Sequence, residues 1–482
     1  MSDYSLNNEK GGPRQAAGRD ALGYQFLRRL AKLLLSVFYR QVEVVGLEHV
    51  PARGPLVLVA NHHNALVDPL LLLATIPRPL VPIAKAPLFR HLLIAPFLRL
   101  IGAIPVRRAQ DPECGPAGPR AEANPSRNGA ALARAIAALQ QGEAILIFPE
   151  GASQPEPTVL PLRTGAARIV LGAERAAGGS LGVTVLPVGL VYHRPAEFRT
   201  GRAVVTIGRP VATADLGARL DGAPEEAVRR LTDRMAQTLR RLIVDANDQE
   251  TLRLLQLAER LWRQESGAPS PGAAARTAWM RQVLQAARYL GAHEPARLEG
   301  FRRELERYSR DLERAGLTGR ELALSYPPGV VARYALREGL WLLLGLPLAR
   351  LGIAIHLLPY QLTRLAVRLG RPDPDEVATW KISAGAVLYP LCWVLEGLAA
   401  WAVGGGWLLA LFLAALVPAG LVALAWQARL ARVRRDARGF LHFLVHRDLH
   451  ERLLARRRAL VAEMEALAAL VPEPVLSGEE AP

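Results

Sequence analysis

Cysteine is nearly absent from this chain of 482 residues, which contains only Cys114 and Cys392. Two cysteines so far apart exclude a disulfide-stapled secreted domain and a cysteine-ligated zinc site. Lysine is also scarce, with four residues, so the formal net charge of +16 comes almost entirely from arginine. Aromatic residues make up 6% of the chain, and no nucleic-acid recognition motif accompanies the positive charge, so we do not expect nucleic acid as a partner.

Charged residues make up only 22% of the chain, whereas hydrophobic residues make up 50%. This balance excludes a mainly disordered protein and indicates a globular or membrane-associated one. Residues 1–20 are polar, contain no apolar run typical of a secretory signal, and are predicted to be disordered. We therefore expect the first domain to remain in the cytoplasm.

Residues 21–44 are predicted to form an amphipathic N-terminal helix with a basic character. Their apolar side chains recur at helical spacing, with Arg28, Arg29 and Lys32 between them. Such a helix can pack against the domain that follows, or it can lie in a membrane interface where its arginines meet anionic headgroups. Both interpretations remain open from the sequence.

Residues 45–211 are predicted to form an α/β domain. Apolar runs at 55–60, 144–148 and 183–191 have the composition of strands that are buried on both faces of a sheet. Helical stretches separate these runs, and strands that alternate with helices indicate a sheet flanked by helices.

The rest of the chain is predicted to be helical and partly embedded in a membrane. Residues 212–335 show helical periodicity, residues 336–435 contain the longest apolar runs, and residues 436–482 return to leucines among many arginines. We therefore predict a helical region, a membrane region and a cytoplasmic helical tail, in this order.

The strongest membrane signal lies at residues 382–426, which contain a single charged residue, Glu396. As a helix this stretch would extend about 67 Å, enough for two crossings of a ~30 Å hydrocarbon core. Glycines 404–406 can supply the turn, so the stretch predicts a transmembrane hairpin. Basic residues flank its outer ends but not the turn, which predicts that both ends, and with them the α/β domain, face the cytoplasm.

Residues 339–360 are a weaker candidate for a membrane crossing. They carry Arg350 near the middle, together with Pro347 and Pro359. A charge at the centre of a bilayer costs at least ~2.5 kcal/mol on insertion scales. The composition therefore favours two half-length or interfacial segments over one full crossing.

A polar turn follows the first buried run and reads Asn-His-His-Asn-Ala-Leu-Val-Asp-Pro over residues 61–69. Asp68 before Pro69 is typical of a helix start, which by itself accounts for both residues. A carboxylate five residues after His63 can also fold back and hold one imidazole nitrogen while the other nitrogen acts as a base. His62 is the rival base, but it lies one residue further from Asp68.

Further charged residues lie at the ends of predicted strands or helices. Glu150 and Gly151 follow a buried run, at the edge where open α/β sheets collect ligands. Arg163 precedes a predicted helix, where a guanidinium can bind a phosphate through two hydrogen bonds. Residues 102–108 form a short apolar run that ends in two arginines.

In this order, these segments resemble the sequence blocks of the glycerolipid acyltransferase family, which includes the glycerol-3-phosphate and lysophosphatidate acyltransferases. The resemblance covers about residues 40–211 and implies an α/β acyltransferase domain with a mixed sheet flanked by helices. The matching blocks are residues 61–68, 102–108, 148–153 with 162–165, and 185–188.

Within the family, the chain looks most like the fungal-type glycerol-3-phosphate or dihydroxyacetone phosphate acyltransferases, which also carry membrane segments after the catalytic domain. It departs from them at Gln154, where a histidine is expected, and at Arg163, where a lysine is common. Arg163 keeps the positive charge that a phosphate needs, whereas Gln154 bears on the preference for the acceptor.

The resemblance implies that His63 is the general base that removes a proton from an acceptor hydroxyl, and that Asp68 orients and stabilises His63. The hydroxyl oxygen then attacks the carbonyl carbon of an acyl thioester, either acyl-CoA or acyl carrier protein. No metal or other cofactor is implied, because a thiolate is already a good leaving group. The residues implied to hold the phosphorylated acceptor are Arg108, Glu150, Gly151, Ser153 and Arg163.

The sequence thus predicts a multi-pass membrane enzyme that transfers a fatty acyl group to a glycerol phosphate in phospholipid biosynthesis, with a lipid bilayer as its partner. Lysophosphatidate, which is already monoacylated, is the alternative acceptor. An alternative from another class is a catalytically silent membrane scaffold that binds lipid. The presence of His63, Asp68, Glu150 and Arg108 together favours the enzyme.

Overall fold

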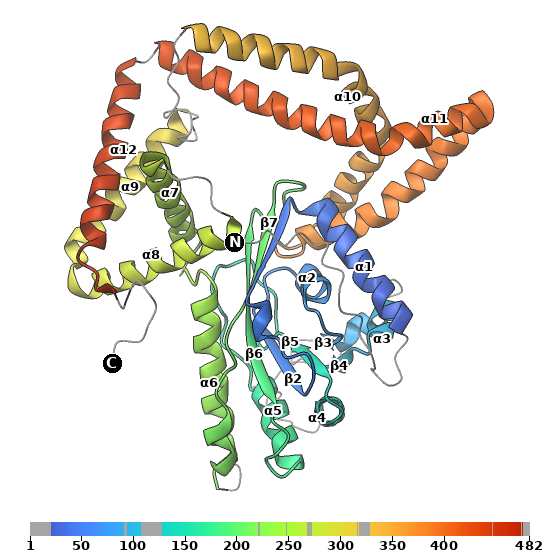
Figure 1. Ribbon diagram of the computed structural model, residues 1–482, viewed down its shortest axis with the longest axis vertical. Helices are drawn as coiled ribbons and strands as arrows, with labels where there is room; N and C mark the ends of the chain where they lie inside the picture. Colours follow the sequence, from blue (N-terminus) through green and yellow to red (C-terminus); the bar gives the residue numbers. More distant parts are fainter. Residues whose placement is uncertain are drawn as a thin grey trace. The chain divides into compact units, whose positions relative to one another are not determined.

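A computed structural model describes residues 21–90, 94–107, 128–219, 222–246, 248–267, 272–315, 317, 328–445, 447–473 and 475 (Figure 1). The chain divides into two compact units. The first unit contains Met1–Leu252, Pro271–Arg281 and Asp373–Thr379, and the second contains Arg253–Ser270, Gln282–Pro372 and Trp380–Pro482. The first unit therefore extends beyond the predicted α/β domain at both ends and includes two segments from later in the sequence.

A seven-stranded sheet forms the centre of the first unit, with the strand order β1-β7-β6-β2-β5-β3-β4. Neighbouring strands are parallel except β6 and β7, which are antiparallel. The mixed sheet confirms the predicted fold class. The strands are β1 Gln41–Val45, β2 Leu56–Ala60, β3 Leu80–Lys85, β4 Ile104–Val106, β5 Ala144–Ile147, β6 Thr184–His193 and β7 Arg202–Ile207.

Both faces of this sheet are buried, which accounts for the continuous apolar composition of β2 and β5. Val57 and Val59 pack into a core with α4, α5 and α6, whereas Leu56 and Leu58 are buried on the opposite face. Successive residues of a strand point to opposite faces, so a strand covered on both sides needs apolar residues at every position. The helices of this unit are α1 Ala21–Phe38, α2 Val67–Thr75, α3 Ala95–Leu100, α4 Gly129–Gln140, α5 Gly165–Ala176 and α6 Pro224–Leu242.

Helix α1 is amphipathic, as predicted, and it packs within the first unit. It ends at Phe38, earlier than predicted, because residues 41–44 belong to strand β1. Its buried face contacts α2, and the Tyr24 hydroxyl accepts a 3.0 Å hydrogen bond from the backbone N–H of Leu80 at the start of β3. A second apolar face of α1 remains exposed. The buried side chains are Tyr24, Leu27, Ala31, Leu35 and Phe38, and the exposed ones are Leu22, Phe26, Leu33 and Val37.

The second unit is helical. Helices α7, α8 and α11 each begin in the first unit and continue in the second. Helices α9 and α12 are joined by an ion pair of 2.7 Å between Arg297 and Glu463. The bounds are α7 Gln249–Ser266, α8 Ala273–His293, α9 Pro295–Arg314, α10 Pro328–Gly370, α11 Val377–Val445 and α12 Arg447–Ala468.

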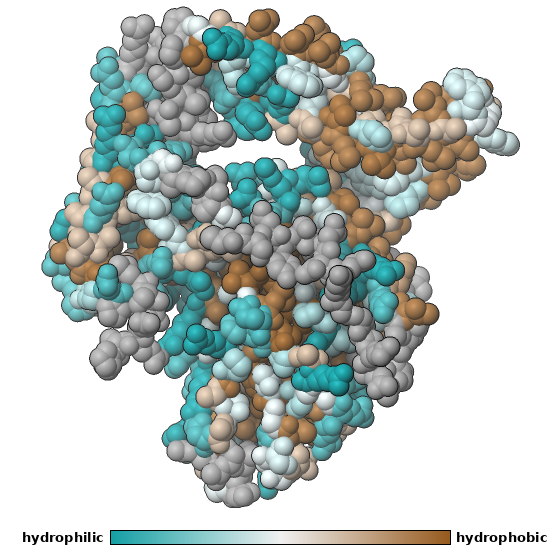
Figure 2. Space-filling view, in the orientation of Figure 1, coloured by the Kyte–Doolittle hydropathy of each residue, from teal (hydrophilic) through white to brown (hydrophobic). Residues whose placement is uncertain are grey.

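Two helices of the described part, α10 and α11, are long and apolar enough to cross a membrane. Large hydrophobic side chains on them are exposed, which gives the brown surface at the upper right of Figure 2. Gly405 has φ 68° and ψ −160°, a non-helical conformation that interrupts α11. The interruption lies within the predicted glycine turn and divides α11 into two arms.

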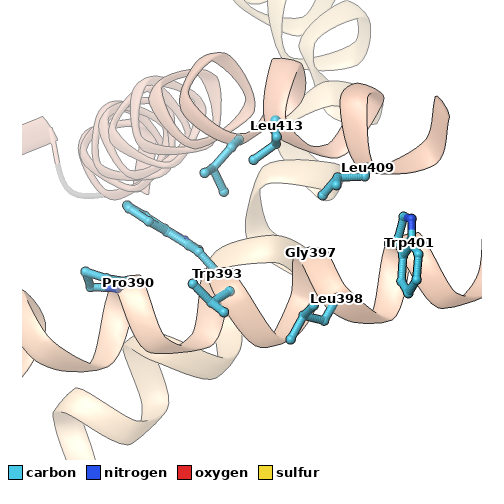
Figure 3. Close-up of a pocket in the computed structure, with 9 residues that line it drawn as sticks. Pro390, Trp393, Gly397, Leu398, Trp401, Leu409 and Leu413 are labelled. Carbon is cyan, nitrogen blue, oxygen red and sulfur yellow. The ribbon is translucent and has the colours of Figure 1, made fainter. Parts of the chain in front are cut away.

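The two arms of α11 contact each other near the turn. Gly397 on the first arm lies so close to the second that a β-carbon there would be 3.4 Å from a side-chain methyl carbon of Leu409. The two arms also line an open apolar pocket of about 670 Å³ (Figure 3). Its lining includes Pro390, Trp393, Leu398 and Trp401 of the first arm with Leu409 and Leu413 of the second.

Helix α10 is one continuous helix that passes through Pro347 and Pro359, so the predicted break into two half-length segments is wrong, whereas the interfacial alternative stays a prediction. A proline removes one backbone hydrogen bond and bends a helix without necessarily ending it. Near Pro359 the Thr363 hydroxyl donates a 2.8 Å hydrogen bond to the Pro359 carbonyl oxygen, one turn earlier in the helix.

Helix α10 runs antiparallel along the second arm of α11. The indole N–H of Trp426 donates to the Leu342 carbonyl oxygen at 2.8 Å, and His356 Nε2 lies 3.1 Å from the Leu416 carbonyl oxygen. Between these contacts Gly352 lies directly against the backbone of α11. A β-carbon at this position would lie 2.0 Å from the Ala419 carbonyl oxygen, so only glycine fits.

We expect Gly352→Ala to destabilise the second unit, because its methyl group would collide with the backbone of α11. Overpacking of this kind typically costs about 1–3 kcal/mol. The thermal unfolding midpoint of the full chain in detergent micelles measures the effect. Gly339→Ala is the matched control, since no atom lies within 4 Å of a β-carbon there. Equal midpoints for the two variants would contradict the close packing at Gly352.

Candidate active site

The carboxyl ends of β2 and β5 bring the candidate residues together. These strands are parallel neighbours with Val59 opposite Ile147, so the turn after β2 and the turn after β5 emerge at the same edge of the sheet. The first turn carries the histidines and Asp68, and the second carries Glu150 and Gly151. Ligands of open α/β sheets bind at this edge.

Asp68 is the centre of the first turn and is completely buried. Its Oδ2 atom lies 2.8 Å from Nδ1 of His62 and accepts backbone N–H bonds from His63 at 2.7 Å and Asn64 at 2.8 Å. The sequence predicted that this helix starts at Asp68. The N-cap of α2 is instead Leu66, two residues earlier, and Asp68 lies in the first turn of the helix. From there the carboxylate folds back over the turn instead of capping the helix.

His62, and not His63, forms the imidazole–carboxylate pair with Asp68, so the predicted pairing through the five-residue interval is not found. The His63 ring turns the other way, with Nδ1 3.2 Å from the Gln154 carbonyl oxygen. Because Asp68 accepts the backbone N–H of His63, it lies beside the main chain of that residue and not beside its ring. Burial lowers the pKa of His63, although the negative charge of Asp68 opposes this effect.

Two further contacts hold His62, one at its ring and one at its backbone. The ring stacks on Phe148 with the ring centres 4.2 Å apart and the planes 20° from parallel. The backbone N–H of His62 donates to Oε1 of Glu150 at 2.9 Å. Sequence reasoning missed the contribution of Phe148, although Phe148 belongs to one of the recognised blocks.

Glu150 connects the two turns from a position that is 4% exposed. One carboxylate oxygen accepts the His62 N–H, and the other accepts the Leu160 N–H at 3.2 Å. Burial raises the pKa of Glu150 to about 7, against the opposing effect of these two donors. With a backbone partner on each oxygen, Glu150 positions the loops around His62, whereas the sequence predicted that it binds the acceptor.

Gly151 and Arg163 lie against each other. Gly151 has φ +76°, which favours glycine, and a β-carbon there would lie 2.5 Å from Nε of Arg163. The backbone N–H of Arg163 donates to the Pro149 carbonyl oxygen at 2.8 Å. The guanidinium itself is exposed, and none of the described residues forms a hydrogen bond or ion pair with it.

The remaining predicted acceptor-binding residues are less defined. Ser153 is half-buried in the loop after Gly151, and its hydroxyl has no hydrogen-bond partner in the described part of the chain. Arg108 lies outside the described residues. Its neighbour Arg107 is exposed just beyond β4, and Lys85 ends β3 opposite Val106.

At Gln154 the chain departs from the subgroup that it resembles, and this residue stabilises the loop in which it lies. Its backbone N–H donates to the His62 carbonyl oxygen at 3.1 Å, and its side-chain amide donates to the Thr158 carbonyl oxygen at 2.9 Å. With its carbonyl oxygen facing His63, Gln154 thus links the second turn to both histidines of the first.

Three residues from other parts of the first unit complete the first turn. The Asn61 side chain exchanges two hydrogen bonds with the backbone of Leu190, at 2.9 and 2.6 Å, and so continues the pairing of β2 with β6. The Tyr192 hydroxyl donates to Oδ1 of Asp68 at 2.5 Å. The Leu66 N–H donates to the Thr379 hydroxyl at 3.2 Å. Neither Tyr192 nor Thr379 lies in a recognised block, so the sequence carried no signal for them.

The geometry fits acid–base chemistry at an imidazole backed by a carboxylate. Among the described residues, no three His, Cys, Asp or Glu side chains are grouped so that they could hold a metal ion. Residues 41–191, which carry all of these turns, match the family model described as Acyltransferase. This part of the chain is a glycerolipid acyltransferase-family domain.

Several proteins are similar to the acyltransferase domain. Glycerol-3-phosphate O-acyltransferase 2 of Saccharomyces cerevisiae is 36% identical over 24% of this chain and 16% of its own length. The 1-acyl-sn-glycerol-3-phosphate acyltransferase of Bacillus subtilis is 29% identical over 45% of this chain and 96% of its own length. The crystal structure of the 1-acyl-sn-glycerophosphate acyltransferase from Thermotoga maritima is 21% identical, with a TM-score of 0.33 over 45% of this chain and 79% of that chain.

Matches to the longer relatives are confined to part of their length. The chain spans 46%, 16% and 18% of three curated fungal relatives. The family assignment therefore concerns the acyltransferase domain, residues 41–191, and not the helical second unit.

Proposed function

We propose that the protein transfers a fatty acyl group from an acyl thioester to a hydroxyl of a glycerol phosphate. The observation that carries the proposal is the His62–Asp68 pair, with its 2.8 Å contact, at the sheet edge of an acyltransferase-family domain. The names of the similar proteins, which include both glycerol-3-phosphate and 1-acylglycerol-3-phosphate acyltransferases, support this reaction class.

The proposed general base is Nε2 of His62. An ionised carboxylate only accepts hydrogen bonds, so the contact with Asp68 places the imidazole proton on Nδ1 and leaves the Nε2 lone pair available. Nε2 takes the proton of the acceptor hydroxyl while the oxygen attacks the thioester carbonyl carbon. The tetrahedral intermediate then expels the thiolate, which receives a proton. We propose no cofactor for these steps, because proton transfer and positioning supply what they need.

The proposed phosphate site consists of basic residues near the same sheet edge. Arg163 is held against Gly151, next to the turn that binds His62. Strands β3 and β4 are parallel to β5 and end at this edge with Lys85 and, just beyond β4, Arg107. We retain Arg108 in this role, and we propose that Ser153 and the Gly151 turn contribute to the same site. Guanidinium groups suit phosphate because they donate two parallel hydrogen bonds.

Lysophosphatidate remains the alternative acceptor, since a similar protein is named for that reaction. Assays of the purified full chain with acyl-CoA or acyl carrier protein as donor, and with each phosphorylated acceptor, distinguish the two. No transfer to either acceptor would favour a lipid-binding scaffold without catalytic activity.

We propose that the two arms of α11 form a membrane hairpin and that the catalytic domain faces the cytoplasm. Lys381 precedes the first arm, arginines follow the second, and the turn at Gly405 has none. Helix α10 is also long enough to cross. Two crossings predict that reporters fused after residues 200 and 482 give signals from the same side of the membrane. Signals from opposite sides would show that α10 crosses as well.

We expect His62→Ala to abolish acyl transfer and His63→Ala to retain a large part of it. General-base catalysis contributes roughly 10²–10⁴ in rate, so the difference between the variants will be clear in kcat. Thermal unfolding of both variants serves as the control for folding. Full turnover by His62→Ala would refute the proposed base, and the loss of turnover only in His63→Ala would restore the interval predicted from the sequence.

Arg163→Ala is expected to raise KM for the phosphorylated acceptor and to leave KM for the thioester nearly unchanged. A hydrogen bond to a charged group contributes about 1.5–3 kcal/mol, which corresponds to roughly 10- to 150-fold in KM. Arg168→Ala is the matched control, because this arginine is exposed on α5 and pairs with Glu225. Equal changes for both substrates would indicate a structural role for Arg163.

A further inference from the structure

The two oxygens of the Asp68 carboxylate have different partners. Oδ2 receives three N–H groups, one of them from the His62 ring. Oδ1 receives the Tyr192 hydroxyl at 2.5 Å, and no other hydrogen bond to it is found among the described residues. Because Asp68 is completely buried, water does not replace these donors. Tyr192 is therefore the hydrogen-bond donor to Oδ1 of Asp68, the oxygen that does not contact His62.

Tyr192 approaches Asp68 from a rigid part of the sheet. It lies on β6, opposite Ala203 of β7 in the antiparallel pair. Its ring is 5.9 Å from the ring of Tyr39, which is itself buried and donates its hydroxyl to the Pro195 carbonyl oxygen at 3.2 Å. A strand fixes a side chain more firmly than a loop does, so the hydroxyl is held in place before substrate binds.

The Tyr192 hydroxyl keeps its proton and acts as the donor. Burial raises the pKa of Tyr192 well above its ordinary value, and the negative charge of Asp68 adds to this effect. A donor–acceptor distance of 2.5 Å is typical of an O–H group that donates to a charged oxygen.

We propose that Tyr192 is a positioning residue that sets the proton affinity of the His62 imidazole through Asp68. This inference rests on the proposed function, in which His62 is the base. Each hydrogen-bond donor draws negative charge away from the Asp68 carboxylate. With Tyr192 as its fourth donor, the carboxylate therefore attracts a protonated His62 ring less strongly than it would with the other three donors alone. Tyr192 thus lets His62 release its proton to the departing thiolate, while it also prevents rotation of the carboxylate.

Other titratable groups surround His62 and have to be separated from this effect. In the described part of the chain they are Asp68, His63 and Glu150, in addition to Tyr192. The pKa of Glu150, raised by burial to about 7, lies in the range where histidine titrates. A pH profile of activity alone does not distinguish Glu150 from His62, so the test has to observe the His62 ring itself.

Tyr192→Phe removes one oxygen atom and leaves Asp68, His63 and Glu150 in place. We expect the pH at which the His62 ring titrates to rise by roughly half a unit to one unit, because the carboxylate loses a charge-assisted donor. The acid limb of the pH profile of kcat/KM should shift to higher pH by the same amount, and kcat should fall about tenfold. KM for both substrates should change little.

The measurement is the ¹⁵N NMR titration of the histidine-labelled full chain in detergent micelles, with the His62 signal assigned by its loss in His62→Ala. Tyr39→Phe is the matched control, since its hydroxyl binds Pro195 and not Asp68. As a second variant, 3,5-difluorotyrosine at position 192 is a stronger donor of the same shape, and it should lower the His62 titration midpoint.

Opposite shifts in the phenylalanine and fluorotyrosine variants would support the proposal. An unchanged His62 midpoint in both, or an equal shift in Tyr39→Phe, would overturn it. The titration does not need turnover, so it reports on Tyr192 even if the wild-type chain transfers no acyl group and the proposed function fails.

Discussion

The arrangement of the acyltransferase site depends on the hydrogen bonds that converge on the buried Asp68 carboxylate. Its four donors come from the His62 ring, from two backbone N–H groups of the same turn and from Tyr192 on β6. A buried carboxylate without partners is very costly, so these donors and the carboxylate stabilise one another. These contacts hold the turn in a conformation in which the His62 ring lies between Asp68 and Phe148.

The sheet explains why segments that are distant in the sequence reach one site. Strand β2 lies between β5 and β6, and residues 61–64 leave the sheet beside the end of β5. Glu150 then joins the two turns through backbone N–H groups on either side. Because this link uses the main chain, it constrains the path of the loops and does not depend on which side chains they carry.

Hydrophobic patterning predicted the fold well, because β2 and β5 are buried on both faces and the glycine triplet contains the break in α11. The site was predicted less well. An interval between a histidine and an aspartate does not reveal which of two adjacent imidazole rings faces the carboxylate. In the structure His63 donates its backbone N–H to Asp68, and its ring does not contact the carboxylate. Tyr192 lies 124 positions from Asp68. Only the strand order brings it near, so no local pattern could reveal it.

The contact of Leu66 with Thr379 shows that the catalytic fold is discontinuous in sequence. Thr379 belongs to the first unit, yet residues Gln282–Pro372 of the second unit lie in the chain between its segment, Asp373–Thr379, and the preceding part of the first unit, Pro271–Arg281. A fragment that ends after α6 would contain every recognised motif but would leave the Leu66 N–H of the catalytic turn without this acceptor. The apolar part of α11 follows Thr379 directly in the chain. Helix α11 is consequently not an appendage that can be removed without effect, because its first residues, Val377–Thr379, are structural components of the first unit.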